Sequence, residues 1–423
     1  MLIGHSSIIQ ETSEVTTVKN SSSALTHLPG WAMQGHPFSS TFVTPVDSET
    51  QLDDSNNGGG READQEAICE WDITLSTVVC PGMNSNAVSL SDALGVTEFD
   101  PTGRFLVTGG SARKIRLYAV DSLLPCDHGR AGDVTFLDHG SAGASRYMFT
   151  PAKLSSLKWK PHAGGRIIGS GDYDGVVMEY DLETRLPVYE RDEHGGRRIW
   201  SIDYSQSMHL GASGSDEGSL QLWDSRCADG KSVAAVWPSR SSTSTPSSVC
   251  CVEFEPMNGS TIAVGCADKK AYMYDARMMA RPMVVLEGHT KTVTYVKFLD
   301  DGTLVTSSVD GQLKLWNLDR GMRPVRSYTG HQNSRNFVGL SVWRHGGLLV
   351  CGSESNQVFV YDKRWSKPIW VHGHSPDLGG DSVNGIVCSV AWRQEEGAVA
   401  ADSTVLAAGG SDGLLHVFRC VRK

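Results

Sequence analysis

Aspartates and histidines recur along the chain in a pattern that could support proton transfer. Aspartates stand just before a short alternating apolar segment at Asp172, Asp174, Asp216, Asp268, Asp310 and Asp412. A Gly-His pair precedes other alternating segments at His289, His331 and His374. Paired carboxylates can act as general acid and general base. The pattern alone does not establish catalysis, so we looked for other catalytic motifs in the sequence.

The known catalytic and metal-binding motifs are missing or incomplete. Residues Ala228–Ser232 (ADGKS) end like a phosphate-binding loop, but Ser225 stands where its leading glycine should be. The chain contains no His-Glu-x-x-His and no Gly-x-Ser-x-Gly. Its ten cysteines include no Cys-x-x-Cys, so we expect free thiols and no zinc site or redox pair. We predict that the protein is not an enzyme and has no catalytic residues, metal or cofactor.

Charge and composition divide the chain into a leader and a body. Residues 1–67 carry nine acids and two bases, a net charge of −7 out of the −10 of the whole chain. The leader is rich in Ser, Thr, Asn and Gly and poor in aromatic residues, so we predict that residues 1–67 are disordered. No apolar run reaches the roughly 18 residues of a membrane helix. We expect residues 68–423 to form one folded body that does not associate with a membrane.

The body consists of seven repeated units. Each unit has an alternating strand, a strand rich in small residues, and a third strand that ends in an aromatic residue. The aromatic endings are Tyr118, Tyr180, Trp223, Tyr274, Trp316, Tyr361 and Phe418, separated by 42 to 62 residues. Period-two alternation at this spacing is typical of four-stranded blades. We therefore predict an all-β protein, a seven-bladed β-propeller.

The end of the chain indicates how the ring closes. The seventh unit supplies strands near 387–391, 405–409 and 414–418, and Lys423 leaves no room for a fourth. An unpaired outer edge would be open to aggregation. We expect residues 68–80 to supply the missing strand, with 70–79 as its strand-like part.

The Gly-His pairs and Trp223-Asp224 resemble the WD-repeat family over about four-fifths of the chain. The resemblance implies a structural role for the recurring aspartates, which in that family accept hydrogen bonds from turn amides and from the Gly-His imidazole. His289, Asp310 and Trp316 make the most complete set. The first unit has Ser111-Ala112-Arg113 and the sixth has Glu354 at the aspartate position, so we expect those blades to be less regular.

Several cations and aromatic residues fall in loops that open on one end of a propeller, around its channel. These loops contain Arg113, Arg116, Tyr173, Arg197-Arg198-Ile199-Trp200, Lys291 and Arg335-Asn336-Phe337. Aromatic walls surrounded by cations suit an extended peptide with a short apolar core and acidic flanks. Nucleic acid is the competing interpretation, but the chain lacks an extended basic face, so we expect no nucleic-acid partner.

Longer motifs are similar to the propeller of the plant COP/SPA photomorphogenesis repressors. They are Ser170–Gly175 (SGDYDG), Arg198–Tyr204 (RIWSIDY), Ile262–Asp268 (IAVGCAD), Gly288–Phe298 (GHTKTVTYVKF) and Gly330–Leu340 (GHQNSRNFVGL). Without a RING-type Cys/His array or a heptad run, the chain most resembles the repressor of UV-B photomorphogenesis (RUP) proteins. The resemblance implies a negative regulator that binds the UV-B photoreceptor and returns it to the inactive homodimer, in nucleus and cytoplasm.

The same resemblance implies a mouth that binds Val-Pro peptides with acidic flanks, found in photoreceptor tails and light-signalling transcription factors. The positions that match are Arg116, Tyr173, Arg198, Trp200, Lys291 and Phe337. Arg116 stands where Lys is usual and Ser334 where an acid is usual, so the polar rim differs from that of the family.

A second motif favours an alternative function. Trp223, Asp224 and Arg226 match the Trp-Asp-x-Arg box of substrate receptors for cullin-RING ubiquitin ligases, with weaker matches at 274–277 and 361–364. This box predicts an adaptor-binding surface at the end opposite the peptide mouth. An assembly platform whose mouth binds no peptide is a third hypothesis.

Overall fold

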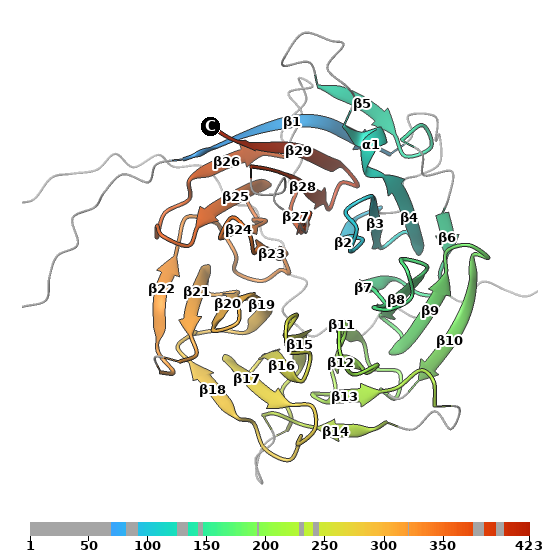
Figure 1. The fold of residues 1–423 in the computed structure, drawn as a ribbon, viewed down its shortest axis with the longest axis vertical. Helices are drawn as coiled ribbons and strands as arrows, with labels where there is room; N and C mark the ends of the chain where they lie inside the picture. The colour runs from blue at the N-terminus through green and yellow to red at the C-terminus, as the bar shows by residue number, and fades with distance from the viewer. Residues whose placement is uncertain are drawn as a thin grey trace, which may run out of the picture. The chain divides into compact units, whose positions relative to one another are not determined.

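Seven sheets stand around a central axis in the computed structural model (Figure 1). The structure describes residues 69–81, 92–124, 134–142, 147–192, 194–227, 232–239, 245–319, 321–374, 385–394 and 402–423. The predicted leader, residues 1–67, lies outside them. The prediction of an all-β seven-bladed propeller is confirmed.

The blades follow one another in chain order. The first contains β2 (Leu94–Phe99), β3 (Phe105–Gly110), β4 (Lys114–Ala119) and β6 (Tyr147–Phe149), with helix α1 (Val120–Leu123) after β4. The second contains β7 (Leu154–Trp159), β8 (Ile167–Asp172), β9 (Val176–Asp181) and β10 (Leu186–Asp192). The third contains β11 (Ile199–Tyr204), β12 (Gly211–Ser215), β13 (Leu220–Trp223) and β14 (Ala234–Val236).

The remaining blades repeat this order from the axis outward. The fourth contains β15 (Val249–Phe254), β16 (Thr261–Cys266), β17 (Lys270–Asp275) and β18 (Val284–Glu287). The fifth contains β19 (Val293–Asp300), β20 (Thr303–Ser308), β21 (Gln312–Asn317) and β22 (Pro324–Tyr328). The sixth contains β23 (Leu340–Trp343), β24 (Leu348–Cys351), β25 (Gln357–Asp362) and β26 (Trp370–Gly373).

The seventh blade joins the two ends of the described body. It contains β27 (Val387–Trp392), β28 (Ser403–Gly410) and β29 (Leu415–Arg422), and β1 (Trp71–Cys80) pairs antiparallel with β29. A fifth strand, β5 (Thr135–Asp138), which the sequence did not predict, pairs parallel with β1. Glu70 adds ion pairs to Arg364 and Arg422 beside this junction. The outer edge of β29 is thereby covered.

The hydrophobic core lies between neighbouring blades. The aromatic residues that end the third strands are buried there, and Trp223, Trp316 and Tyr361 are at most 1% exposed. The second strands carry small or branched apolar residues, and every residue of β16 is buried. Burial of this kind supplies most of the stability of a propeller, since neighbouring blades are held together by apolar packing.

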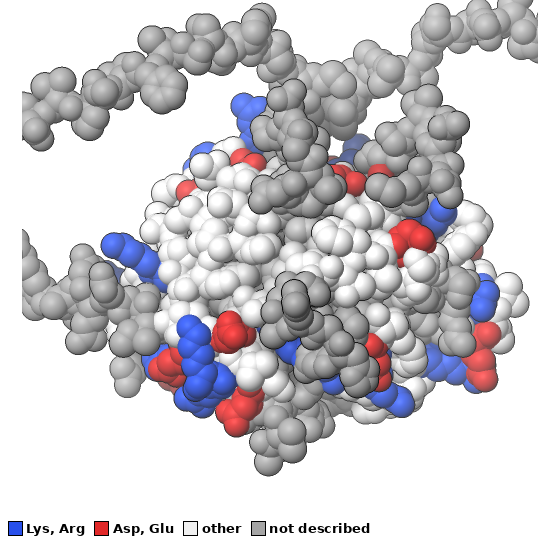
Figure 2. All heavy atoms as spheres, turned by 90° about the horizontal axis from the view of Figure 1, so that it is seen from above, with Lys and Arg blue, Asp and Glu red and all other residues white. Residues whose placement is uncertain are grey.

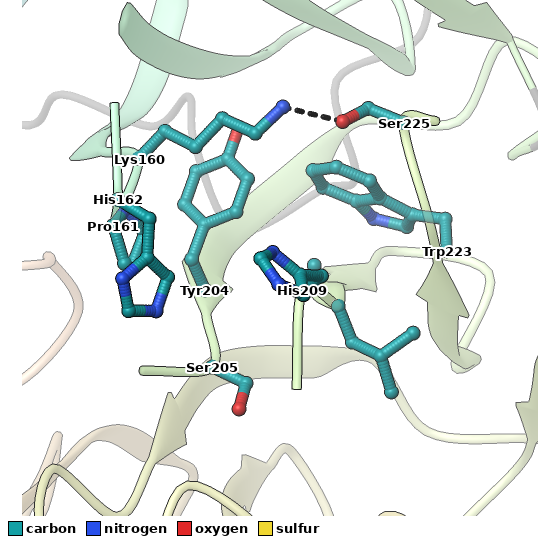
Figure 3. Close-up of a pocket in the computed structure, with 10 residues that line it drawn as sticks. Lys160, Pro161, His162, Tyr204, Ser205, His209, Trp223 and Ser225 are labelled. Carbon is teal, nitrogen blue, oxygen red and sulfur yellow. Dashed lines mark hydrogen bonds between the residues drawn. The ribbon is translucent and has the colours of Figure 1, made fainter. Parts of the chain in front are cut away.

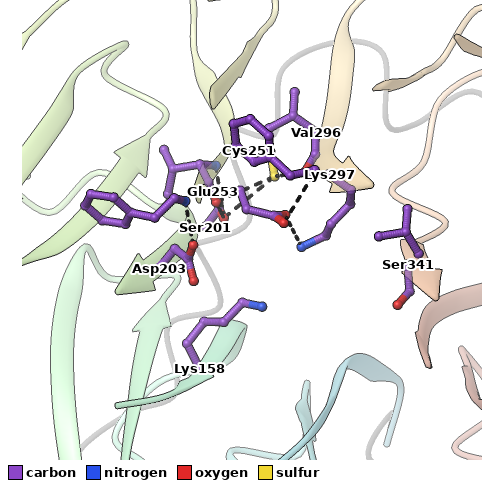
Figure 4. A network of polar contacts seen from close by, with 12 residues as sticks. Lys158, Ser201, Asp203, Cys251, Glu253, Val296, Lys297 and Ser341 are labelled. Atoms are coloured by element: carbon purple, nitrogen blue, oxygen red, sulfur yellow. Dashed lines mark hydrogen bonds and ion pairs between the residues drawn. The ribbon is translucent and has the colours of Figure 1, made fainter. Parts of the chain in front are cut away.

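Side chains bridge the innermost strands, which have no further strand on their inner edge. Ser201 and Asp203 in the third blade accept hydrogen bonds from the backbone N–H groups of Val252 and Phe254 in the fourth (Figure 4). Burial raises the pKa of Asp203 to about 6, although the positive charge of Lys158 acts in the opposite direction. These bonds satisfy backbone donors that would otherwise be unpaired, and so fix each blade against the next.

Ion pairs also join neighbouring blades. The Lys297 ammonium lies 2.6 Å from one carboxylate oxygen of Glu253 (Figure 4). The Arg344 guanidinium lies 3.3 Å from the other oxygen. Because these three residues come from the fifth, fourth and sixth blades, the pairs set the spacing of three neighbouring blades.

No helix among the described residues is long and apolar enough to cross a membrane. No group of three or more His, Cys, Asp or Glu side chains in the same ranges could hold a metal ion.

Candidate functional site

Four aromatic residues from four blades meet at one mouth of the channel. Trp200 in β11 stacks on Phe337, from the loop before β23, with ring centroids 4.5 Å apart and planes 10° from parallel. Tyr173, in the turn between β8 and β9, lies 6.4 Å from Trp200, and Tyr295 in β19 meets Phe337 edge-on at 5.7 Å. We call Tyr173, Trp200, Tyr295 and Phe337 the mouth cluster. Its members span more than 160 positions of the chain.

A cation packs against two rings of the mouth cluster. The Arg198 guanidinium lies 4.0 Å from the Tyr173 ring centroid and 4.6 Å from that of Trp200. Tyr173 is 37% exposed, and Trp200 and Phe337 are partly buried. A guanidinium over two rings keeps its outward N–H groups available for an acidic ligand. The site thus combines an apolar wall with a positive edge.

The indole of Trp200 is oriented by a hydrogen bond. Its Nε1 donates to Oδ1 of Asp216 at 3.2 Å, and the Ser248 hydroxyl donates to the same oxygen at 2.9 Å. Asp216 is one of the recurring aspartates of the sequence pattern. Here, its carboxylate orients a mouth residue, a contact that sequence analysis missed.

Glu354 holds the loop that carries Phe337. Its two carboxylate oxygens accept hydrogen bonds from the backbone N–H groups of Ser334, Arg335 and Asn336 and from the Ser334 hydroxyl and Asn336 side-chain amide. Burial alone would raise the pKa of Glu354, but these hydrogen bonds outweigh it and lower the pKa. A carboxylate with several N–H donors is strongly fixed. Glu354 therefore positions Phe337 from the turn of the sixth blade.

Tyr295 belongs to the cluster although sequence analysis did not select it. It stands three residues before the inner-strand anchor Phe298, a position occupied in five of the other blades by Ser156, Ser201, Cys251, Gly339 and Ser389. The residue at this place in the sixth blade is Gly339, where a side chain would meet Ser389 and Val390 of the seventh blade. A large residue among small ones at a channel position was the signal that could have identified it.

Two predicted mouth residues, Arg116 and Lys291, have other contacts than those of the mouth cluster. Arg116 in β4 is buried, and its guanidinium lies 2.6 Å from the carboxylate of Asp92. Lys291, just before β19, is exposed, and its carbonyl accepts a hydrogen bond from Ser308. The structure thus brings together Tyr173, Arg198, Trp200 and Phe337 and gives Arg116 a different partner.

A buried polar network organises the fifth blade. His289 contacts Asp310 at 3.0 Å through Nδ1 and Thr306 at 2.7 Å through Nε2, and the Trp316 indole donates to Thr306 at 2.9 Å. Asp310 also accepts from the backbone N–H groups of Thr290 and Gln312 across the turn at Gly311, whose φ is 77°. Thr306 was not foreseen from the sequence. Both oxygens of the Asp310 carboxylate accept structural hydrogen bonds, and Asp172, Asp268 and Asp412 likewise accept hydrogen bonds from turn amides.

The Trp-Asp-x-Arg box has a defined geometry after β13. Trp223 is fully buried, and the Asp224 carboxylate accepts a forked hydrogen bond from Arg226, with the closest N–O distance 2.6 Å. The Arg226 hydrogen bond lowers the pKa of Asp224. The same fork recurs at Asp275–Arg277 and Asp362–Arg364, but Arg364 also pairs with Glu70. Arg226 and Arg277 side chains are 63% and 67% exposed.

A small cavity lies beside this box (Figure 3). Its volume is about 20 Å³, enough for one water molecule. Trp223 and Tyr204 form apolar walls, and the Lys160 ammonium donates to the Ser225 hydroxyl across one side. The cavity is too small to receive a side chain of a partner.

Charged side chains on the face seen in Figure 2 form small groups of both signs, separated by wide uncharged areas. Mixed groups of this kind produce little long-range attraction for a polyanion. On this face, recognition must come from local contacts.

Comparison with known proteins identifies the family. The model of the nucleolar protein 10-like N-terminal domain matches residues 196–361. The WD repeat-containing protein RUP1 of Arabidopsis thaliana is 55% identical over 354 residues, 83% of this chain and 85% of RUP1. The chain belongs to the RUP family of WD-repeat proteins. Arabidopsis RUP2 is 54% identical to this RUP-family chain, over 79% of it and 89% of RUP2.

More distant relatives in the COP/SPA branch match this chain over less than half of their own length. The Arabidopsis E3 ubiquitin-protein ligase COP1 is 33% identical to the RUP-family chain over 76% of it and 43% of COP1. The resemblance to the RUP and COP/SPA branch is thereby shown. Together with the propeller, these relatives identify the protein as a WD-repeat regulatory scaffold with protein partners.

Proposed function

We propose that this RUP-family scaffold is a non-enzymatic negative regulator of UV-B photoreceptor signalling. It binds the photoreceptor through the mouth cluster and promotes its return to the inactive homodimer, acting in nucleus and cytoplasm. The observation that carries the proposal is the convergence of Tyr173, Trp200 and Phe337, with Arg198 above them, at one mouth.

The mouth suits an extended peptide with an apolar core and acidic flanks. Stacked rings offer a rigid apolar surface that loses little conformational entropy on binding, and Arg198 offers N–H groups to a carboxylate. Val-Pro segments of the photoreceptor, of COP/SPA-type repressors or of light-signalling transcription factors have this character. Binding several such peptides at one mouth would also let the scaffold displace one partner from another.

Return of the photoreceptor to its homodimer needs no chemical step by the scaffold. A protein that binds the re-associating conformation more tightly than the active monomer shifts the equilibrium by its differential affinity. A factor of ten in that differential affinity corresponds to about 1.4 kcal/mol.

Photoreceptor re-dimerisation provides the test. Purified photoreceptor is converted to monomer by UV-B and its return to dimer is followed by size-exclusion chromatography with wild-type scaffold, Trp200→Ala or Trp237→Ala. Trp237 is 37% exposed after β14 and serves as the matched control. We expect acceleration by wild type and Trp237→Ala and a large loss with Trp200→Ala. Equal rates for all three proteins would remove the mouth from the mechanism.

The second candidate function is that of a substrate receptor of a cullin-RING ubiquitin ligase acting on light-signalling transcription factors. It is favoured by the exposed forks of Arg226 and Arg277 on two neighbouring blades. A guanidinium held in place by an aspartate is pre-organised to meet a further carboxylate of an adaptor.

Capture of the ligase adaptor on immobilised scaffold tests this alternative. Arg226→Ala should reduce capture while leaving peptide affinity at the mouth unchanged. Lys270→Ala, which breaks an exposed ion pair with Glu287, is the control. Unchanged capture by Arg226→Ala would count against the receptor function.

A further inference from the structure

The geometry points to a second subsite, on the first blade, that extends the mouth. We propose that Arg113, Lys114, Tyr147, Phe149 and Lys153, which we call the blade-one surface, bind an acidic segment that continues from the peptide held at the mouth cluster. The inference rests on the proposed function of the mouth.

The outer strand of the first blade exposes two aromatic rings. Phe149 is 68% and Tyr147 is 44% exposed, and their rings meet edge-on with centroids 5.2 Å apart. The Lys114 ammonium lies 5.3 Å from the Tyr147 centroid and 5.5 Å from that of Phe149. In the β4–β6 register Lys114 stands opposite Phe149, which fixes the cation beside the rings. Exposing two aromatic rings to water is unfavourable, and exposed apolar patches often mark binding sites. A cation beside the rings adds a group that can attract an anionic ligand.

The blade-one surface is joined to the mouth cluster by a continuous series of hydrogen bonds. The Tyr173 backbone N–H donates to the Lys153 carbonyl at 3.0 Å. Two residues earlier, the Pro151 carbonyl accepts from the Arg113 guanidinium at 3.3 Å, and the Thr150 N–H donates to the Arg113 carbonyl at 3.0 Å. Arg113 is followed directly by Lys114. A ligand that leaves the mouth over Tyr173 therefore reaches this surface along one loop.

The charge of the blade-one surface selects the chemistry of the ligand. Arg113 and Lys153 are exposed, and neither they nor Lys114 form an ion pair with the acids of the described residues. Three cations without acidic partners favour carboxylates, while the two rings can pack against the aliphatic parts of an extended chain. The segment that fits is a run of Asp and Glu with an occasional apolar residue.

Fluorescence anisotropy with matched peptides tests the subsite on the full chain. A short acidic Val-Pro peptide probes the mouth alone, and two longer versions add about six acidic residues before or after it. With wild type, we expect one extension to tighten binding roughly fivefold at low ionic strength, with the gain falling as salt is added. A Lys114→Gln, Phe149→Ser double variant should bind the short peptide normally but lose the gain.

The control and the failing results separate the two proposals. Arg281→Gln removes an exposed cation from the loop between β17 and β18, and should keep the full gain. Failure of the short peptide to bind wild type would count against the proposed function. Binding of the short peptide with no gain from either extension, or an equal gain in the double variant, would overturn the subsite. If the chain's own acidic leader occupied the blade-one surface, neither extension would tighten peptide binding, and the proposed subsite would be overturned.

Discussion

The blade-five network and the mouth cluster are built in opposite ways. His289, Thr306, Asp310 and Trp316 belong to one blade and satisfy one another with hydrogen bonds, and all but the partly buried Asp310 are buried. The mouth cluster gathers rings from four blades, keeps Tyr173 37% exposed, and has the Arg198 guanidinium 4.0 Å from the Tyr173 ring centroid. The network closes on itself, whereas the cluster presents an unfilled surface. The difference teaches that the same repeat builds a self-satisfied polar network inside a blade and a partly exposed aromatic cluster between blades, where we propose that partners bind.

The largest expected effect comes from breaking the network. Asp310→Ala removes the acceptor of His289 and of two turn amides, leaving buried polar groups without partners. We expect the free energy of unfolding to fall by about 3 kcal/mol, measured by denaturant unfolding, with peptide affinity at the mouth nearly unchanged below the transition. A large loss of affinity in the folded variant would contradict the separation of the two regions.

A second expected effect concerns pH. His331 occupies in the sixth blade the place of His289, but its Nδ1 contacts the Tyr361 hydroxyl at 3.0 Å in place of a carboxylate. Burial lowers the pKa of His331 from 6.5 to about 4, although Asp310 acts weakly in the other direction. The unfolded chain takes up a proton near pH 6.5 while the folded chain does so only near pH 4. Stability is therefore lost as pH falls from 6.5 to 4, by up to about 3 kcal/mol.

The comparison of wild type with His331→Gln measures this contribution. The wild-type unfolding midpoint should fall more steeply than that of the variant between pH 7 and pH 4, because the variant has no imidazole to titrate. Parallel pH profiles would show that the burial of His331 does not control its proton affinity.

The smallest expected effect comes from changing Glu354, which supports the loop of the mouth residue Phe337. Glu354→Gln replaces a carboxylate that accepts five hydrogen bonds with an amide that can accept only part of them, so the Phe337 loop should loosen. We expect peptide affinity to fall roughly fivefold with about 1 kcal/mol loss of stability, measured by anisotropy and denaturant unfolding. A loss of stability with full affinity would mean that Glu354 supports the blade but does not position Phe337.

Repetition explains what the sequence predicted. The aromatic endings such as Trp223 and Tyr361 recur in every unit, so the number of blades follows from their spacing, and the burial of these residues follows from the fold. β5 was not predicted because it does not repeat: it leaves the first blade and pairs with β1. The sequence could place Tyr173, Trp200 and Phe337 at one mouth because it showed which pair of strands each of their loops connects.

Contacts between non-equivalent positions were beyond sequence reasoning. The pairing of Arg116 with Asp92 joins β4 to the residues just before β2, a contact that the repeat pattern does not specify. Two further contacts could be found only from atomic positions: the hydrogen bond from Trp200 to Asp216, and the hydrogen bonds of Glu354 to the Phe337 loop. The sequence does not reveal them, because acidic side chains at the same position in other blades bind turn amides. The repeat fixes where a side chain stands, but its partner is set by packing.

A double-mutant cycle on Trp200 and Phe337 tests most directly whether distant segments form one site. The affinity of the short acidic Val-Pro peptide is measured for wild type, Trp200→Ala, Phe337→Ala and the double variant. Each single change should weaken binding by roughly thirtyfold or more. Because the rings stack on each other, the double variant should bind only slightly more weakly than either single variant. Losses that multiply would contradict a single site built from the two rings.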